Sequence, residues 1–368
     1  MKTKVVFITN ILRQPRCIRR IQDFINRGYG VKVYGFDRGG DSRALPPFAH
    51  ECIGVVSSET SYLKRLFIIW GGISKVIRKE GKGCLYYLFS LDNAIVARLA
   101  CRNIKYIYEI SDLMELTINN KFLSRLLARM NRETVKHAIL SVYTSEGFVQ
   151  FLNPKGADPK KSVVLPNKLN ASCRNKLLAK ESPADMNHIR FGFVGAIRTE
   201  TTYNLIKAIG ECGKHEVHLY GIFTDENNGR YSIRSLVGQY KNVIYHGPFR
   251  NPDDLPKIYS QIDIVLCYYK SSENDLYLEP NKLYEAIYFD CPIIVADDTF
   301  VGGRVRQLHV GYTIERGDAA SLNDFITSIN QADFDEKVAA IKAISKDDCI
   351  DNPQLLFDRL KSIQPFVV

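Results

Sequence analysis

The chain has 368 residues, of which 45% are hydrophobic and 24% charged, and its formal net charge is +10. This composition is typical of a globular protein of about two domains and excludes a disordered or fibrous chain. No apolar run approaches the roughly 18 residues that span a bilayer, and no cleavage site follows the first apolar run, so we expect a cytoplasmic protein. The nine cysteines are scattered, which predicts buried thiols in a reducing compartment and no metal site.

The positive charge is concentrated in the first half of the chain. Residues 1–185 contain 31 Lys and Arg against 15 Asp and Glu, whereas residues 186–368 contain 19 against 25. This asymmetry favours a polyanionic partner: nucleic acid, an anionic membrane or a phosphate-bearing substrate. Because the sequence contains no recognised nucleic-acid motif, we do not expect nucleic acid.

The first half reads as an α/β unit, because short apolar runs alternate with stretches of helical periodicity, which is typical of a parallel sheet. The predicted elements are a strand at 4–9, a helix carrying Ile18, Ile21 and Ile25, strands at 31–36 and 84–89, a helix at 92–101, and strands at 105–110, 138–144 and 163–167. We expect this Rossmann-like, acceptor-binding domain to span 1–170, with a polar linker at 171–187.

The second half repeats the pattern. Its predicted elements are a strand at 189–194, a helix at 202–212, strands at 217–220, 243–245 and 262–268, a helix at 280–289, a strand at 292–296 and a helix at 353–363. We expect a nucleotide-sugar-binding domain at 188–345, and a C-terminal helix within 346–368 that packs back toward the N-terminal domain. Two doubly wound sheets predict a cleft between them, with ligands outside the carboxyl ends of the strands.

The most specific segment is Glu279-Pro-Asn-Lys-Leu-Tyr-Glu-Ala286. Pro280 suits the first turn of a helix, and the free N–H groups at that end predict a phosphate site. Lys282 adds a positive charge there, and Glu285 can accept two hydrogen bonds from a ribose diol. The alternative is an ordinary amphipathic helix with a charge pair.

Several predicted strands end in glycine. The segment Phe191 to Arg198 begins as a buried strand and continues into a glycine turn. Gly195 in this turn lets a phosphate approach the backbone, and Arg198 can hold a diphosphate bidentately. Tyr220-Gly221 and His246 to Phe249 repeat this arrangement. Phe249 can flank a base or pack in the core.

These segments resemble a known family. Pro280 to Glu285 resembles the helix entry, Pro-Asn/Ser-Lys-Leu-aromatic-Glu, of the large GT-B glycosyltransferase family that builds bacterial surface polysaccharides. Further segments that resemble the family are Gln14 to Arg16, Gly28 to Tyr34, Tyr108 to Leu113, Val142 to Glu146, Asn242 to Cys267 and Tyr288 to Ile294. The resemblance covers almost the whole chain.

The resemblance implies an α/β fold of two Rossmann-like doubly wound domains facing across a cleft (GT-B). It implies a metal-independent, hexosyltransferase-type enzyme that moves a sugar from a UDP- or GDP-linked donor, without a cofactor, to a glycan or lipid-linked acceptor in capsule, O-antigen or exopolysaccharide biosynthesis. The implied donor-binding residues are Gly195, Arg198, Tyr220, Gly221, Phe249, Glu279, Asn281, Lys282, Leu283 and Glu285. The implied acceptor-side residues are Arg13, Arg16 and Asp112, and the implied catalytic residues are Asp112, Arg198 and Lys282.

Three positions depart from the family pattern. Tyr277 stands where retaining members carry the first of two glutamates, Ser111 replaces a histidine, and residues 10–13 replace a Gly-Gly turn. Retention and inversion of the anomeric centre therefore both stay open. Asp112 can act as a base or cap the helix that follows. A nucleotide-sugar epimerase and a non-catalytic scaffold of the same fold are the alternative functions.

Two segments, 62–79 and 119–136, mix bulky apolar and cationic residues. As amphipathic helices they can lie on an anionic membrane surface, which would place the protein peripherally on the inner face of the cell membrane. The alternative is that both helices pack on the sheet and expose a solvated basic face.

Overall fold

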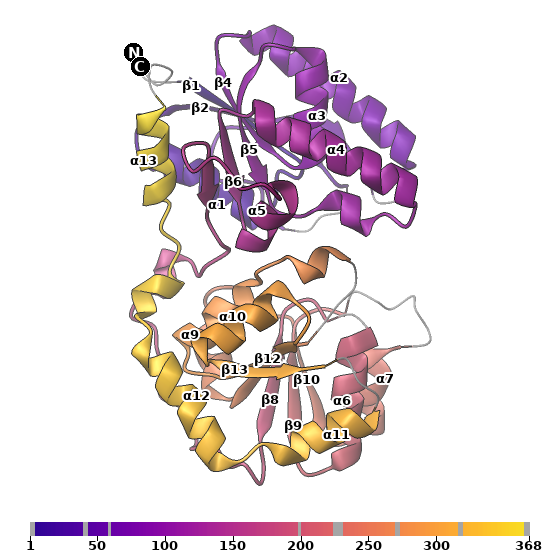
Figure 1. Cartoon of the computed structure of the whole chain (residues 1–368), viewed down its shortest axis with the longest axis vertical. Helices are drawn as coiled ribbons and strands as arrows, with labels where there is room; N and C mark the ends of the chain where they lie inside the picture. Colours follow the sequence, from indigo (N-terminus) through magenta and orange to yellow (C-terminus); the bar gives the residue numbers. More distant parts are fainter. Residues whose placement is uncertain are drawn as a thin grey trace. The chain divides into compact units, whose positions relative to one another are not determined.

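The chain forms two compact units, which the computed structural model describes over residues 4–39, 43–57, 60–197, 200–223, 231–268, 273–315 and 319–363. Unit 1 comprises Met1–Leu165 and Asn352–Val368, and unit 2 comprises Pro166–Asp351. Each unit is a parallel sheet with helices on both faces (Figure 1).

Unit 1 contains a sheet of seven parallel strands in the order β3-β2-β1-β4-β5-β6-β7. The strands are β1 (Lys4–Thr9), β2 (Gly30–Asp37), β3 (Glu51–Val55), β4 (Leu85–Phe89), β5 (Lys105–Ile110), β6 (Leu140–Tyr143) and β7 (Ser162–Val164). The strand order reverses between β1 and β4, so the carboxyl ends of these two strands flank the place where ligands bind in such sheets.

The helices of unit 1 cover both faces of this sheet. They are α1 (Pro15–Asn26), α2 (Tyr62–Glu80), α3 (Leu91–Ala100), η1 (Met114–Thr117), α4 (Lys121–His137), α5 (Glu146–Leu152) and α13 (Gln354–Ser362). Helix α3 contacts both α2 and α4, and the three lie along one face of the sheet in Figure 1.

Helix α13 belongs to unit 1 because its apolar side chains complete the core beside α1. The Phe357 ring lies 4.8 Å from the Phe24 ring, which in turn lies 5.1 Å from the ring of Phe7 in β1. The Arg27 guanidinium lies 4.1 Å above the Phe357 ring and donates to the Gln354 side chain (2.8 Å).

Unit 2 contains a sheet of six parallel strands in the order β10-β9-β8-β11-β12-β13. The strands are β8 (Arg190–Val194), β9 (Glu216–Tyr220), β10 (Val243–Gly247), β11 (Ile264–Cys267), β12 (Ile293–Ala296) and β13 (Gly311–Ile314). Strands β11 and β12 are buried at every position, because helices cover both of their faces.

The helices of unit 2 form two apolar layers. One core cluster joins the sheet to α6, α7 and α11, and the other joins it to α8, α9 and α10. The helices are η2 (Ala171–Cys173), α6 (Glu200–Cys212), α7 (Ile233–Gln239), α8 (Leu255–Ser260), η3 (Glu273–Leu276), α9 (Asn281–Tyr288), α10 (Phe300–Leu308), α11 (Ala319–Ser328), α12 (Gln331–Ala343) and η4 (Lys346–Cys349).

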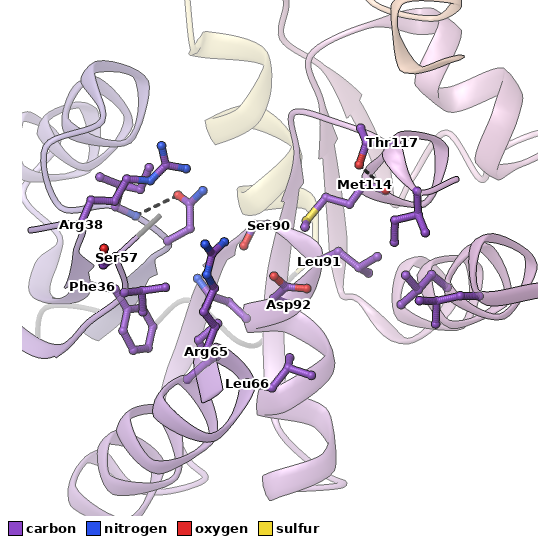
Figure 2. A pocket seen from close by; sticks show the side chains of 18 residues that line it. Phe36, Arg38, Ser57, Arg65, Leu66, Ser90, Leu91, Asp92, Met114 and Thr117 are labelled. Atoms are coloured by element: carbon purple, nitrogen blue, oxygen red, sulfur yellow. Dashed lines mark hydrogen bonds between the residues drawn. The ribbon is translucent and has the colours of Figure 1, made fainter. Parts of the chain in front are cut away.

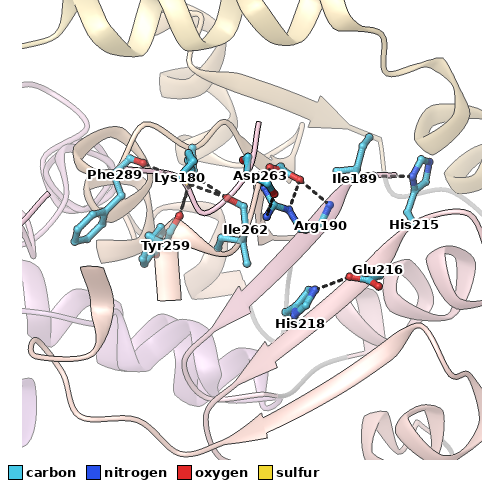
Figure 3. Close-up of polar contacts among 12 residues, drawn as sticks. Lys180, Ile189, Arg190, His215, Glu216, His218, Tyr259, Ile262, Asp263 and Phe289 are labelled. Atoms are coloured by element: carbon cyan, nitrogen blue, oxygen red, sulfur yellow. Dashed lines mark hydrogen bonds and ion pairs between the residues drawn. The ribbon is translucent and has the colours of Figure 1, made fainter. Parts of the chain in front are cut away.

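The segment predicted as a linker, 171–187, is attached to unit 2. The Lys180 ammonium donates to the carbonyl oxygens of Tyr259 (2.9 Å) and Ile262 (2.8 Å) and to the Cys291 Sγ (2.7 Å). Figure 3 shows Lys180 among these residues and, beside them, the ion pair between Arg190 and Asp263 (Nη2–Oδ1 2.6 Å).

The observed division of the chain therefore differs from the predicted boundaries. It falls after Leu165 rather than at 170, and unit 2 extends to Asp351 rather than 345. The composition of 171–187 is polar, but its few anchoring side chains find partners that are distant in the sequence, and such pairing leaves no local pattern.

Candidate functional site

A pocket of about 290 Å³ opens in unit 2 at the carboxyl end of β8 and the first turn of α9. Its lining residues are Phe193, Val194, Gly195, Ala196, Phe249, Asn251, Asn281, Lys282 and Glu285. It thus brings together five of the predicted donor-binding residues: Gly195, Phe249, Asn281, Lys282 and Glu285.

The start of α9 lies at this pocket. Pro280 adopts an extended conformation (φ −74°, ψ 148°) before the helix, and no side chain caps that end. The side chain of Asn281, the first residue of the helix, donates to Glu285 Oε1 (2.7 Å). Because the first N–H groups of a helix lack intrahelical acceptors and carry partial positive charge, this end favours an anion.

Lys282 places a full positive charge beside this helix end. Its side chain is buried, and its Nζ lies 5.0 Å from the centroid of the Phe193 ring. Gly195 has φ +132°, and a Cβ built there would lie 3.1 Å from Lys282 Nζ. Glycine at 195 therefore leaves space at the lysine ammonium and permits a backbone conformation that other residues rarely adopt.

Glu285 is a buried carboxylate held by two donors. Its Oε1 accepts from the Asn281 amide, and its Oε2 accepts from the Tyr259 hydroxyl (2.8 Å). Burial raises the pKa of Glu285, while the Tyr259 hydroxyl, the Lys282 charge and the Asn281 amide act in the opposite direction. Each carboxylate oxygen has a second lone pair, so the group can still accept bonds from a ligand diol.

The turn after β9 supports the turn after β8. Gly221 has φ +142°, and a Cβ there would lie 1.8 Å from the Gly195 carbonyl oxygen, so glycine is required. The Gly195 N–H donates to the Tyr220 carbonyl (2.8 Å). Tyr220 stacks on His246 with ring centroids 4.3 Å apart, and burial raises the pKa of Tyr220 to about 12. Neither Tyr220 nor Gly221 lines the pocket.

Glu279, Leu283 and Arg198 do not contribute side chains to the described pocket. The Glu279 carboxylate accepts from the Tyr284 hydroxyl (2.8 Å) and lies 3.7 Å from Arg304 Nε. Leu283 is buried in the core of unit 2. Arg198 lies outside the described residues.

Two side chains that sequence reasoning missed belong to this site. Tyr259 orients Glu285 from the end of α8, and Asn251 lines the pocket from the loop after β10. The Tyr259 contact left no signal, because the two residues lie 26 positions apart on different helices. Asn251 stands directly before Pro252, and an Asn-Pro pair is typical of turns. This pair was the one sign in the sequence that a loop begins there.

In unit 1, the predicted acceptor-side residues take up positions outside its large pocket. Arg16 Nε lies 3.3 Å from the carboxylate of Glu109, which is fully buried and also pairs with Arg20. Arg13 Nη2 lies 3.6 Å from Asp37 Oδ2. Asp112 follows β5 and is exposed, and Leu113 rather than Asp112 occupies the cap position of η1.

The large pocket of unit 1 has a volume of about 650 Å³ and lies at the carboxyl ends of β1 to β4 (Figure 2). Its lining residues are Asn10, Ile11, Phe36, Arg38, Val56, Ser57, Arg65, Leu66, Ile69, Ser90, Leu91, Asp92, Asn93, Met114, Thr117, Ile118, Leu123 and Leu127. Asp92 is its one carboxylate among the described residues.

Known structures share the fold of this chain. Sucrose-phosphate synthase from Thermosynechococcus elongatus superposes with a TM-score of 0.71 at 12% identity, over 99% of this chain and 100% of the other. HepE from Anabaena in complex with UDP gives a TM-score of 0.69 at 15% identity, over 98% and 99% of the two chains. The chain has the GT-B fold. The predicted fold class of two Rossmann-like doubly wound domains is thus confirmed.

Among curated proteins, the chain is similar in sequence to ExoL, the succinoglycan biosynthesis protein of Rhizobium meliloti (strain 1021). The two are 21% identical over 340 residues, which cover 87% of this chain and 83% of ExoL. No protein-family model matches the chain. HepE has also been solved with UDP-glucose, and that structure superposes with a TM-score of 0.67 at 16% identity, over 98% of this chain and 99% of HepE.

The described residues contain neither a membrane-spanning helix nor a cluster of metal ligands. No helix there is both long enough and apolar enough to cross a membrane. Over the same residues, His, Cys, Asp and Glu side chains form no group of three or more that could hold a metal ion.

Proposed function

We propose that this chain is a glycosyltransferase of exopolysaccharide biosynthesis, which moves a hexose from a nucleotide-diphosphate sugar to a glycan or lipid-linked acceptor. The observation that carries the proposal is that Lys282 and Glu285 line one pocket beside the uncapped start of α9. The resemblance to ExoL supports the pathway, and the HepE complexes with UDP and UDP-glucose support the donor class.

The donor's diphosphate binds at the start of α9. Negative charge accumulates on the diphosphate as the bond to the sugar breaks, so groups that attract it more strongly at that stage accelerate transfer. Lys282 and the N–H groups of the first turn supply this attraction without a metal ion. Gly195 lets the phosphates approach the lysine, and Arg198 is proposed to add a second cation.

The nucleoside binds beside the diphosphate. Glu285 accepts hydrogen bonds from the ribose hydroxyls, and the two donors that hold its carboxylate keep it ionised and oriented despite burial. Phe249 lies at the same pocket, where its ring packs against the base.

The protein also acts at an anionic membrane surface. Phe67 in α2 and Phe122 in α4 are 77% and 78% exposed, and the flanking residues of both helices include lysines and arginines. Such a surface suits the headgroup region of an anionic bilayer. Replacing both phenylalanines by serine should abolish sedimentation with phosphatidylglycerol liposomes at low salt. Leu355→Ser, at an exposed leucine of α13, should not. Equal sedimentation of all variants would contradict this role.

Calorimetric titration with UDP and GDP tests the donor site. Wild-type protein should bind at least one of them, and Lys282→Met should weaken this binding about 10- to 100-fold, because a hydrogen bond to a charged group contributes about 1.5–3 kcal/mol. Lys257→Met removes an exposed lysine of α8 and should leave the affinity unchanged. Absence of binding to both nucleotides would overturn the proposal and favour a non-catalytic scaffold.

A further inference from the structure

The walls of the large pocket of unit 1 are apolar. Leu66 and Ile69 face it from α2, and Leu123 and Leu127 face it from α4. Ten of the 18 lining residues are Ile, Leu, Val, Met or Phe. Removing apolar surface from water is favourable, so a hydrocarbon chain would be stabilised against these walls.

Positive charge lies beside these apolar walls. Arg38 follows β2 and is exposed, and Arg65 in α2 is half-buried, with its Nε donating to the Thr60 carbonyl (2.7 Å). Figure 2 shows the Arg65 side chain extending from α2 toward the ends of the strands. Two guanidinium groups at one pocket favour a phosphate, which they can hold in planar, bidentate fashion.

Asp92 introduces a carboxyl group into the same space. It stands in the first turn of α3, and no hydrogen bond or ion pair with another described residue involves it. Burial raises the pKa of Asp92. Asp92 is half-buried, so a ligand hydroxyl that bonds to this carboxyl group would restore hydrogen bonding that it loses on leaving water.

We propose that this pocket binds an amphiphilic acceptor: its hydrocarbon chain packs along α2 and α4, its phosphate contacts Arg38 and Arg65, and a hydroxyl of its head group bonds to Asp92. The inference rests on the proposed glycosyltransferase function and chooses the lipid-linked acceptor over a free glycan. The exposed Phe67, Trp70 and Phe122 lie on the same two helices, so an acceptor embedded in a membrane would meet this part of the unit.

Calorimetric titration with farnesyl diphosphate, which has both a chain and phosphates, tests the chemistry. It should bind at least tenfold more tightly than farnesol, which lacks the phosphates, and than inorganic diphosphate, which lacks the chain. Dihexanoylphosphatidylglycerol distinguishes a specific acceptor site from a site for bulk membrane lipid, and it should also bind at least tenfold more weakly. Equal affinity for any of the three would overturn the proposal.

Matched variants locate the binding. Leu66→Glu places a charge on the pocket wall, whereas Phe67→Glu places the same charge on the exposed face of the next position. The first should reduce farnesyl diphosphate binding at least tenfold and the second less than twofold. Arg65→Gln should also weaken binding at least fivefold. The proposal fails if Leu66→Glu binds as wild type does.

UDP or GDP titration of the same preparations separates the possible failures. A variant that keeps nucleotide binding and its circular dichroism spectrum is folded, so its loss of farnesyl diphosphate binding can be assigned to the pocket. If wild-type protein binds nucleotide but not farnesyl diphosphate, the acceptor inference fails alone. If it binds neither nucleotide, the proposed function fails, whatever the result with farnesyl diphosphate.

Discussion

The Asn281 amide donates to the Glu285 carboxylate one turn later in α9, with an Nδ2–Oε1 distance of 2.7 Å. This contact holds the carboxylate in place beside the start of the helix. Pro280 at the cap position has no side-chain acceptor, so the helix end is left open to a phosphate. Both ends of a nucleoside diphosphate thus have complementary groups within two turns of one helix.

Glu285→Gln should reduce UDP or GDP affinity about 10- to 100-fold, because an amide presents one acceptor oxygen, not two, and carries no charge. Glu279→Gln is the matched control, since Glu279 is also buried but accepts from the Tyr284 hydroxyl and does not line the pocket. Its affinity should change less than threefold. Calorimetric titration measures both, and a larger loss in the Glu279 variant would reverse the assignment.

Tyr259→Phe should shift the pH dependence of nucleotide binding. Burial already raises the pKa of Glu285 above its ordinary value of 4.5, and the Tyr259 hydroxyl opposes that effect. Binding requires the ionised acid, so affinity should fall as pH drops through this raised pKa. Without the hydroxyl the fall should begin at higher pH. Tyr288→Phe removes a hydroxyl that donates to the Cys173 carbonyl and should leave the profile in place.

Asp92→Asn should stabilise the folded protein at pH 7. Burial raises the folded-state pKa of Asp92 above 3.8, so the folded state disfavours the ionised acid at neutral pH. That cost shrinks as pH falls through the raised folded-state pKa and is gone below the unfolded-state pKa, where both states hold the proton. Urea denaturation should therefore show a gain at pH 7 that shrinks toward pH 4. A gain that grew on acidification would contradict the burial of this group.

The same variant should impair use of the acceptor. With a nucleotide sugar and a lipid extract, Asp92→Asn should raise the KM for the acceptor about tenfold, the cost of about one hydrogen bond to a charged group. The KM for the donor should stay within twofold. Asp112→Asn should change neither value appreciably, since Asp112 lies outside the pocket lining. Loss of activity confined to Asp112→Asn would instead support a catalytic role for Asp112.

Gly221→Ala should cost about 3 kcal/mol of stability or more, because the new Cβ would overlap the Gly195 carbonyl oxygen and φ is +142°. Gly213→Ala separates the two causes: φ there is +66°, but no atom lies within 4 Å of the added Cβ. It should cost about 1 kcal/mol. Urea denaturation followed by circular dichroism gives both values, and equal costs would show that the contact is unimportant.

Local sequence patterns predicted much of the fold. The strands at 4–9 and 105–110 have the predicted bounds, and the helix predicted at 280–289 is α9, Asn281–Tyr288. Strands β3 and β13 were not predicted. Every residue of β3 is half-buried or exposed, and in β13 buried residues alternate with half-buried ones, so neither forms the continuous apolar run that marks a central parallel strand.

The sequence indicated which residues share a pocket where one segment supplies them, and it gave no indication of pairs between distant residues. Asn281, Lys282 and Glu285 lie within one helix, so their spacing determines which face they share. Arg16 was predicted on the acceptor side, and in the structure it pairs with Glu109, which lies 93 positions later in the chain. Asp112 was chosen because it follows a strand, and the same is true of Asp92, which follows β4. Only the packing of α2 and α4 distinguishes their surroundings.

The pairing of Leu169 with Ile350 has a consequence for dissecting the chain. The Leu169 N–H donates to the Cys349 carbonyl (3.0 Å), and the Asp351 N–H donates to the Leu169 carbonyl (2.8 Å). The two ends of unit 2 are thus adjacent, as in a domain inserted into a host domain. Residues 166–351 can therefore be expressed as a separate domain. Unit 1 needs a short loop that joins residue 165 to residue 352, because residues 1–165 alone would lack α13 and expose Phe24.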